Sequence, residues 1–425
     1  MTGNDYEEAG APETGEAMDR MRPLPRISIQ AFCETEGLLR TVERCGEDRR
    51  MGKVNLRVNK GGVAAAVNLF SQQPTPNLII LESDEDRATL LGELEQLADV
   101  CDASTKVVII GHHNDVALYR ELIRNGISEY IVAPVSMADL IGVISAIFVD
   151  PDAEPLGRTV AFVGAKGGCG SSTLAHNCAF AISSLFSEEV ILADLDLAFG
   201  TANINFDQDP PQGISEAVFS PERLDDVFLD RLLAKCSDHL SMLAAPSMLD
   251  KTYDLQRNAF SPMIEVVQRS APVTVLDLPH VWTDWALSVL GEVDQIVVTA
   301  VPDLANLRNT KNLMDVLRKM RPNDHAPHLV LNQVGMPKRP EITPADFAEP
   351  LEMEPIAILP FDSALFGAAA NSGRMISEME PKSAAAETIA QIAHVVTGRA
   401  DTKKRRKGGL SDLMSLIGRK KAAAR

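Results

Sequence analysis

The stretch Phe162-Val-Gly-Ala-Lys-Gly-Gly-Cys-Gly-Ser-Ser-Thr173 decides how the larger part of this chain folds. The apolar run 159–163 that enters it predicts a buried strand, and residues 174–186 that leave it predict a helix. A strand, a glycine-rich turn and a helix in this order form the local context of a phosphate-binding loop. Glycines let main-chain N–H groups approach phosphate oxygens, and the helix N-terminus adds positive potential. The alternative is a glycine-rich turn that holds no ligand.

The loop departs from the ordinary pattern G-x-x-x-x-G-K-[ST] at one position. Gly164 and Gly170 take the two glycine positions, but Ser171 stands where the pattern has a lysine. Lys166 stands near the front of the loop instead, ahead of two further glycines, and Ser172 takes the position of the Mg²⁺-binding hydroxyl. The arrangement resembles the deviant P-loop of the MinD/ParA ATPase family, whose signature lysine precedes the two glycines.

Two further acidic segments follow in the order that this family shows. After the apolar run 190–193 come Asp194 and Asp196, which share one face if the strand continues. The resemblance implies that Asp196 orients the attacking water; two acids that cap a turn are the alternative. The run Val273-Thr-Val-Leu-Asp277 is a Walker B pattern, whose Asp277 is expected to hold Mg²⁺ directly or through water, with a structural cap as the alternative.

Two later segments complete the expected site. A strand over 328–334 carries Asn332, and a strand over 356–360 ends in Pro360-Phe-Asp362. The resemblance implies that Asn332 reads the adenine base and that the second segment lies against the purine. The expected cofactors are ATP or ADP and Mg²⁺, with Lys166 and Asp196 in catalysis and Ser172, Asp196 and Asp277 at the metal. The expected nucleotide-binding residues are Lys166, Gly167, Gly168, Cys169, Gly170, Ser171, Ser172, Thr173, Asn332, Pro360 and Asp362.

The region ahead of the loop alternates between strand-like and helical patterns. Apolar runs at 27–32, 78–81, 107–110 and 129–132 predict strands, and residues 88–100 and 116–125 predict helices between the later ones. This alternation is typical of a doubly wound α/β domain of flavodoxin type. Residues 124–134 resemble the end of a response-regulator receiver domain.

The positions that carry phosphorylation chemistry in a receiver domain hold other residues here. Glu82 stands at the phospho-acceptor position, Gly111 replaces a Ser or Thr, and Ala133 replaces a Lys. Phosphoryl transfer to a carboxylate needs the acceptor, the Mg²⁺-binding acids and the neutralising Lys. We therefore expect a receiver-like fold that is not phosphorylated and that serves docking or dimerisation. Residual regulation by Glu82 as a fixed charge is the alternative.

The chain of 425 residues is long enough for two or three domains. We expect a disordered acidic N-terminus over 1–25, a receiver-like domain over 26–148 and a linker over 149–157. A MinD/ParA-like ATPase domain with a mainly parallel sheet should span 158–398, ahead of a basic tail over 399–425. No apolar run approaches the ~18 residues of a membrane span, and no secretory signal is visible in the first thirty residues. The six cysteines include no C-x-x-C pair, which is typical of reduced thiols in a cytoplasmic protein.

The charge of the chain is unevenly distributed. The formal net charge is −18, but residues 399–425 hold ten Lys or Arg and two Asp or Glu, a charge of +8 that leaves −26 for the remainder. An acidic body disfavours nonspecific DNA binding, and no specific nucleic-acid partner is expected. A basic tail favours an anionic surface. Within the tail, Leu410, Leu413, Met414 and Ile417 recur at helical spacing between basic clusters, as in an interfacial membrane helix. A helix that binds a partner protein, or plain disorder, is the alternative.

Over about residues 26–400 the chain resembles the CpaE/TadZ pilus-assembly proteins, which combine an atypical receiver domain with a MinD/ParA-type ATPase. The most specific strings are Pro302-Asp-Leu-Ala-Asn-Leu-Arg-Asn309 and Leu359-Pro-Phe-Asp-Ser-Ala-Leu-Phe-Gly-Ala-Ala-Ala-Asn371. The resemblance implies an ATP-dependent homodimer, located peripherally at the inner membrane of the cell pole, that recruits the Tad (Flp) pilus secretion machinery.

Because Ser171 lacks the phosphate-neutralising charge of a lysine, we expect a switch or scaffold that hydrolyses ATP slowly. A ParA/MinD-like positioning or partition ATPase and a non-hydrolysing structural adaptor are the competing functions.

Overall fold

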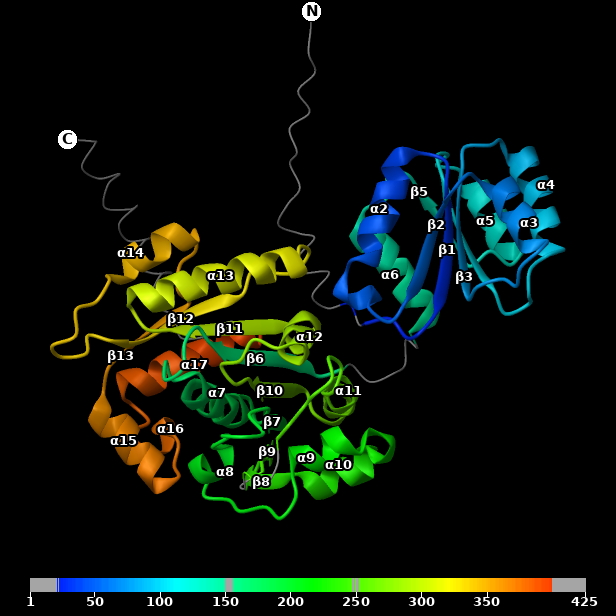
Figure 1. The fold of residues 1–425 in the computed structure, drawn as a ribbon. Coiled ribbons are helices and arrows are strands. Elements are labelled where there is room, and N and C mark those ends of the chain that lie inside the picture. Colours follow the sequence, from blue (N-terminus) through cyan, green and yellow to red (C-terminus); the bar gives the residue numbers. More distant parts are fainter. Residues whose placement is uncertain (1–20, 22, 150–155, 247–248, 250–251, 400–425) are drawn as a thin grey trace, which may run out of the picture. The chain divides into compact units, whose positions relative to one another are not determined.

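The computed structural model describes residues 21, 23–149, 156–246, 249 and 252–399, and its contacts divide the chain into two units (Figure 1). One unit comprises residues 1–154 with 321–325, and the other comprises 155–320 with 326–425. The expected membrane or partner residues Leu410, Leu413, Met414 and Ile417 lie outside the described residues, as does most of the expected N-terminal segment 1–25. Among the described residues, none of the helices is long and apolar enough to cross a bilayer.

The first unit is a five-stranded parallel sheet in the order β2-β1-β3-β4-β5. This is the flavodoxin-type strand order, so the expected fold class is confirmed. Its elements are β1 (Ser28–Cys33), α2 (Glu36–Gly46), the 3-10 turn η1 (Arg49–Met51), β2 (Asn55–Lys60), α3 (Val63–Phe70), β3 (Leu78–Ser83), α4 (Arg87–Ala98), β4 (Lys106–Gly111), α5 (Val116–Arg124), β5 (Glu129–Val132) and α6 (Met137–Phe148).

Helices cover both faces of this sheet and give it two apolar cores. Helices α2 and α6 pack on one face, and α3, α4 and α5 pack on the other (Figure 1). Leu24 is already buried in the first of these cores, two residues ahead of the expected domain start. The sequence did not predict β2, because Asn55-Leu-Arg-Val-Asn-Lys60 is a polar edge strand with no fully buried residue.

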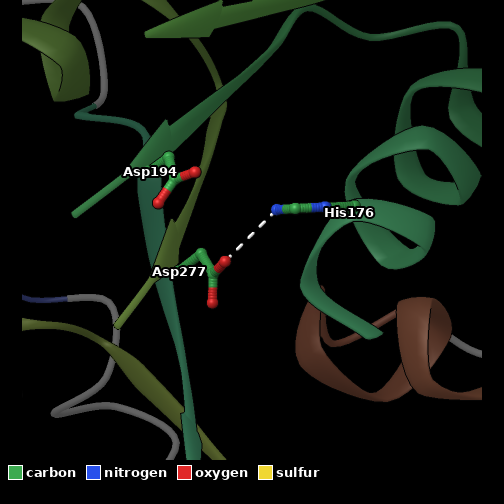
Figure 2. Close-up of side chains that lie close together, drawn as sticks. All are labelled: His176, Asp194 and Asp277. Carbon is green, nitrogen blue, oxygen red and sulfur yellow. Dashed lines mark ion pairs between the residues drawn. The ribbon is translucent and has the colours of Figure 1, made fainter. Parts of the chain in front are cut away.

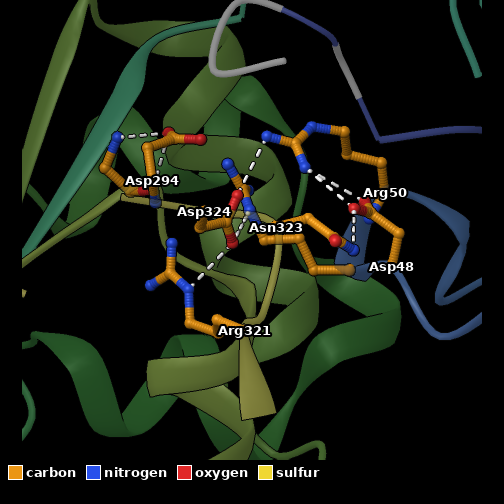
Figure 3. A network of polar contacts seen from close by, with 8 residues as sticks. Asp48, Arg50, Asp294, Arg321, Asn323 and Asp324 are labelled. Carbon is orange, nitrogen blue, oxygen red and sulfur yellow. Dashed lines mark hydrogen bonds and ion pairs between the residues drawn. The ribbon is translucent and has the colours of Figure 1, made fainter. Parts of the chain in front are cut away.

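Residues 321–325, which follow α13 (Leu304–Met320), belong to the first unit by their contacts. The fully buried Arg50 donates from Nη1 to Asp48 Oδ1 at 3.0 Å and from Nη2 to Asp324 Oδ1 at 2.9 Å (Figure 3). Asp324 Oδ2 also accepts from Arg321 Nε at 2.9 Å. Burial alone would raise the pKa of Asp324, but the surrounding guanidinium groups hold it below its ordinary value. This buried charge is therefore paired and hydrogen-bonded, as a stable fold requires.

The second unit is an eight-stranded sheet in the order β13-β12-β11-β6-β10-β7-β9-β8, with only β8 antiparallel among its pairs. The mainly parallel sheet expected for this unit is thereby confirmed. Besides α13, its elements are β6 (Arg158–Gly164), α7 (Ser171–Phe186), β7 (Val190–Asp194), α8 (Ala202–Asn205), α9 (Ile214–Phe219), η2 (Pro221–Arg223), α10 (Asp226–Leu232), β8 (Ala234–Ser237), β9 (Leu240–Leu243), α11 (Ser261–Ser270), β10 (Val273–Asp277), α12 (Asp284–Glu292), β11 (Gln295–Ala300), β12 (His328–Val334), α14 (Pro344–Ala348), η3 (Glu349–Leu351), β13 (Ala357–Pro360), α15 (Ser363–Ser372), α16 (Ile376–Met379) and α17 (Ala384–Val396).

Two apolar cores cover the two faces of this sheet. Side chains of α7 and α17 contribute to one core, and those of α11, α12 and α13 contribute to the other. The strands β6, β10 and β7 are neighbours and run parallel, so the segments that leave them meet at one sheet edge. That edge carries the expected nucleotide site.

Candidate nucleotide-binding site

The glycine-rich loop joins β6 to α7 and has the backbone geometry of a phosphate cradle. Gly170 lies in the left-handed region, with φ of 87°, directly before the first residue of α7. A Cβ added at Gly170 would lie 2.4 Å from Asn332 Nδ2, so only glycine fits this position. The helix begins at Ser171, three residues earlier than the sequence predicted, so its free N–H groups face the loop.

The loop lines a cavity of about 640 Å³. Asp196 and the segments after β7 and β10 form its other walls, together with Tyr253, Leu255 and Trp285. The structure therefore brings the predicted Asp196 to the same cavity as most of the predicted loop. The predicted residues that line it are Lys166, Gly167, Gly168, Cys169, Gly170, Ser171, Ser172, Thr173 and Asp196.

A smaller hollow of about 190 Å³ contains the three residues predicted to contact the base: Asn332, Pro360 and Asp362. Gly170 and Thr173 border both this hollow and the larger cavity. The side chain of Asn332 is buried; its Nδ2 donates to Cys169 O at 2.9 Å, and its Oδ1 accepts from Gln333 N at 2.8 Å. Asn332 thus supports the loop in this structure, and recognition of the adenine base stays a prediction.

Three further side chains hold the loop backbone, and the sequence did not identify them. His280 Nδ1 lies 2.9 Å from Gly164 O, and Asn309 Nδ2 donates to Ala165 O at 3.0 Å. Gln333 Nε2 donates to Gly168 O at 3.1 Å. These bonds satisfy loop carbonyls, so the loop N–H groups stay available for an anion. Asn309 lies in one of the family-like strings, but nothing in that string indicates the carbonyl that it contacts.

Ser171 does not take over the role of the missing lysine. It is buried, and its Oγ has no hydrogen-bond partner among the described residues. Lys166 is exposed at the front of the loop. Burial would raise the pKa of Asp303, but hydrogen bonds from Asn306 and the nearby Lys166 ammonium lower it below its ordinary value. The exposed Lys166 is the lysine of this loop, and the unsatisfied hydroxyl of Ser171 fits a site that is completed by a ligand.

Asp194 and Asp196 do not share a strand face, because β7 ends at Asp194. Asp196 lies in the following loop, where its Oδ1 accepts from Phe199 N at 3.0 Å. Asp194 is fully buried and accepts from the backbone N–H groups of Asp196 and Ala202, both at 3.1 Å. Burial and then the neighbouring carboxylate of Asp277 raise the pKa of Asp194. Only Asp196 is therefore placed to meet a ligand in the cavity.

Asp277 ends β10 directly opposite Asp194 of β7 and is also buried. Its Oδ2 lies 3.2 Å from Nε2 of His176, a residue of α7 that the sequence did not single out (Figure 2). One potential ligand atom each from His176, Asp194 and Asp277 lie within 4.8 Å of one another. Leu278, but not Asp277, lines the cavity among the described residues. The expected contact of Asp277 with Mg²⁺ stays a prediction. Because Asp277 is buried, a contact through a water molecule bound to the ion fits the structure best.

In the first unit, Glu82, which stands at the phospho-acceptor position of a receiver domain, is buried, and both of its carboxylate oxygens accept hydrogen bonds. Its carboxylate accepts from Glu34 N at 2.7 Å, Thr35 N at 2.8 Å and Thr35 Oγ1 at 2.7 Å, and it contacts His112 Nε2 at 3.1 Å. Burial raises the pKa of Glu82, but these hydrogen bonds outweigh burial and lower it below its ordinary value. The carboxylate therefore serves as a fixed anionic acceptor within the fold, and absence of phosphorylation stays a prediction.

No model of a known protein family matches this chain, and no curated protein does. Among solved structures, the second unit resembles a ParA family ATPase from Chlorobium tepidum TLS, at 24% identity, 56% of this chain, 98% of that chain and a TM-score of 0.51. A septum site-determining protein MinD from Pyrococcus horikoshii OT3, solved with Mg-ADP, matches at 17% identity, 57% of this chain, 96% of that chain and a TM-score of 0.50. These likenesses establish a MinD/ParA-like P-loop fold.

The N-terminal part resembles a pilus assembly protein CpaE from Caulobacter crescentus CB15. The identity is 42%, the match covers 30% of this chain and 98% of that chain, and the TM-score is 0.30. The chain belongs to the CpaE pilus assembly protein family. Its second unit has a MinD/ParA-like fold. The family expected from the sequence is thereby confirmed.

Proposed function

We propose that this chain is a nucleotide-dependent scaffold for pilus assembly that binds ATP or ADP with Mg²⁺ and hydrolyses ATP slowly. The observation that carries the proposal is the cavity of about 640 Å³, which the P-loop and Asp196 line together. Main-chain N–H groups of the loop and of the first turn of α7 would hold the phosphates. Ser172 and Asp277 would hold Mg²⁺, which would neutralise phosphate charge when bound.

The same residues support slow turnover. Asp196 would orient the attacking water, and Lys166 would contribute the loop's positive charge. Ser171 supplies no charge at the position where ordinary P-loops carry lysine. Loss of one well-placed group that stabilises a transition state lowers a rate by ~10²–10³. Nucleotide binding should be less affected than hydrolysis, because the N–H cradle is retained.

A second copy of the chain is the proposed partner in the ATP-bound state. Lys166 is exposed, and Phe199, which lines the cavity, and Trp282 are large apolar side chains that are 72% and 56% exposed. Exposed apolar side chains around a nucleotide site favour an interface that forms over the bound ligand. Kinship with CpaE supports pilus components as further partners, and the proposed ones belong to the Tad (Flp) secretion machinery. The proposed location is the cytoplasmic side of the inner membrane at a cell pole, with the basic tail on anionic lipid.

Calorimetry and turnover measurements on three purified proteins test this proposal. The wild type should bind ATP in the presence of Mg²⁺ and hydrolyse it slowly. Lys166→Ala should lower turnover further and weaken binding less, and Ser171→Lys should raise turnover because it restores the cation. Absence of ATP and ADP binding at millimolar ligand would contradict the proposal, as would fast turnover of the wild type. Binding without any turnover would favour the structural adaptor, which Ser171 makes the second candidate.

A further inference from the structure

His176 occupies a special place on the P-loop helix. It lies four residues after Ser172, so the two side chains share one face of α7 at adjacent turns. Its ring is fully buried, and the ring of Phe206 lies beside it with centroids 6.0 Å apart. A buried imidazole costs free energy unless its nitrogens have polar partners. The partners of the two nitrogens therefore indicate what the residue does.

One ring nitrogen faces the Walker B carboxylate. His176 Nε2 lies 3.2 Å from Asp277 Oδ2 (Figure 2). Neither Nε2 nor Asp277 Oδ1 has a well-aligned hydrogen bond among the described residues. Hydrogen bonds in ligand-free sites are often poorly aligned and tighten when the ligand binds. We therefore expect the contact between His176 Nε2 and the Asp277 carboxylate to become a well-aligned hydrogen bond when a cation, or a water bound to it, lies near Asp277.

The other ring nitrogen faces the helix that follows the Asp196 loop. Asn205, the last residue of α8, places its Nδ2 2.8 Å from His176 Nδ1. An amide N–H that donates to Nδ1 leaves the ring proton on Nε2, where it faces Asp277. The imidazole thus spans the distance between the end of β10 and the end of α8.

The loop between β7 and α8 is fastened at both ends to the same buried group. Asp194 Oδ1 accepts from Asp196 N, and Asp194 Oδ2 accepts from Ala202 N, the first residue of α8. A Cβ at Gly200 would lie 2.4 Å from Asp194 Oδ2, so the loop passes closely over this carboxylate. Asp194 in turn lies opposite Asp277 in the sheet. The position of the Asp196 loop therefore depends on the arrangement of the two buried acids and His176.

We propose that His176 is a positioning residue that couples the Mg²⁺ side of the nucleotide site to the Asp196 loop and α8. This inference rests on the proposed function. When Mg²⁺ and ATP bind, the His176 ring holds the Asp277 carboxylate in place through Nε2 and α8 through Nδ1. Nucleotide state is thereby transmitted to residues 195–205, where Phe199 and Ile204 are exposed.

Two substitutions test separately the two contacts of His176, with Asp277 through Nε2 and with Asn205 through Nδ1. His176→Asn retains a polar group near Nδ1 and loses the contact with Asp277. His176→Gln retains a donor near Nε2 and loses the contact with Asn205. The full-length wild type and both variants are compared by calorimetry with ATP in EDTA and in Mg²⁺, and by amide hydrogen exchange over residues 195–205. Thermal unfolding serves as the folding control.

The expected results differ between the variants. In EDTA both should bind ATP as the wild type does, because His176 does not line the cavity. The gain in affinity on adding Mg²⁺ should fall about tenfold in His176→Asn and stay near wild type in His176→Gln. The protection of residues 195–205 from amide hydrogen exchange that Mg²⁺ and ATP produce should be lost in both variants, because each variant lacks one of the two contacts of His176.

Three outcomes would overturn the inference. The first is that Mg²⁺ raises the ATP affinity of His176→Asn as much as that of the wild type. The second is that residues 195–205 are protected from hydrogen exchange in both variants as in the wild type. The third is an equal loss of ATP affinity in EDTA and in Mg²⁺, which would indicate a purely structural role. Absence of ATP binding by the wild type would instead contradict the proposed function, so the two failures are distinguishable.

Discussion

At the scale of single residues, Gly170 is the backbone position on which the phosphate loop depends. It combines a φ of 87° with a would-be Cβ 2.4 Å from Asn332 Nδ2. Gly170→Ala should therefore destabilise the second unit by about 1–3 kcal/mol and weaken ATP binding at least tenfold, because both strain and a clash oppose the native loop. Thermal unfolding and calorimetry measure the two effects.

Gly167 provides the matched control within the same loop. Its φ is not in the left-handed region, and a Cβ there would meet no atom within 4 Å. Gly167→Ala should leave the free energy of unfolding unchanged or raise it by about 0.4–1 kcal/mol. Equal destabilisation by both substitutions would show that the loop tolerates no side chain at all, and would remove the special role assigned to Gly170.

At the scale of elements, Glu82 ties the ends of three strands in the receiver-like unit. Glu82 is the second-to-last residue of β3; its carboxylate accepts hydrogen bonds from Thr35 in the segment after β1 and contacts His112 in the segment after β4. At the same edge, the hydroxyl of Tyr130 donates to His113 O at 2.8 Å and fills the space where a side chain at Gly111 would lie. Glu82 and Gly111, which stand at positions that carry phosphorylation chemistry in a receiver domain, therefore form hydrogen bonds and packing contacts within the fold.

The lowered pKa of Glu82 gives this arrangement a dependence on pH. A carboxylate with a lower pKa in the folded state stabilises the fold above its unfolded value, and this stability is lost as pH falls through the folded value. The first unit should therefore lose stability below about pH 4.5. Glu82→Gln should cost about 1.5–3 kcal/mol at neutral pH and flatten this acid limb. Unfolding followed by circular dichroism from pH 3 to 7 tests both; an unchanged acid limb in Glu82→Gln would contradict the assignment.

At the scale of the whole molecule, the two units have separate apolar cores. A ligand that binds only one unit should stabilise that unit alone. ATP with Mg²⁺ at a hundred times its dissociation constant contributes about 2.7 kcal/mol, which should raise the unfolding temperature of the second unit by roughly 5–10 °C. Scanning calorimetry with and without ligand should show one shifted transition, and the transition that Glu82→Gln lowers should stay in place. A ligand-induced shift of the latter would contradict this assignment.

Much of the architecture could be predicted from local patterns in the sequence. The buried strands of both sheets are short apolar runs, and the turn at 164–173 contains the glycines that its backbone requires. Polar and short elements are harder to predict: β2 is a polar edge strand, and α10 spans only Asp226–Leu232 before Ala234 enters β8. Edge strands and short helices depend on their neighbours more than on their own sequence.

The sequence by itself determined the order of the strand, glycine loop and acids, because these depend on residue type and spacing along the chain. Only the tertiary structure decided that Asp194 and Asp277 are buried with His176, whereas Asp196 reaches the cavity. It also decided that Asn332, Gln333, His280 and Asn309 support the loop. The reason is that burial and contact depend on which strands become neighbours in the sheet, and residues more than a hundred positions apart in the chain meet only after those strands have paired.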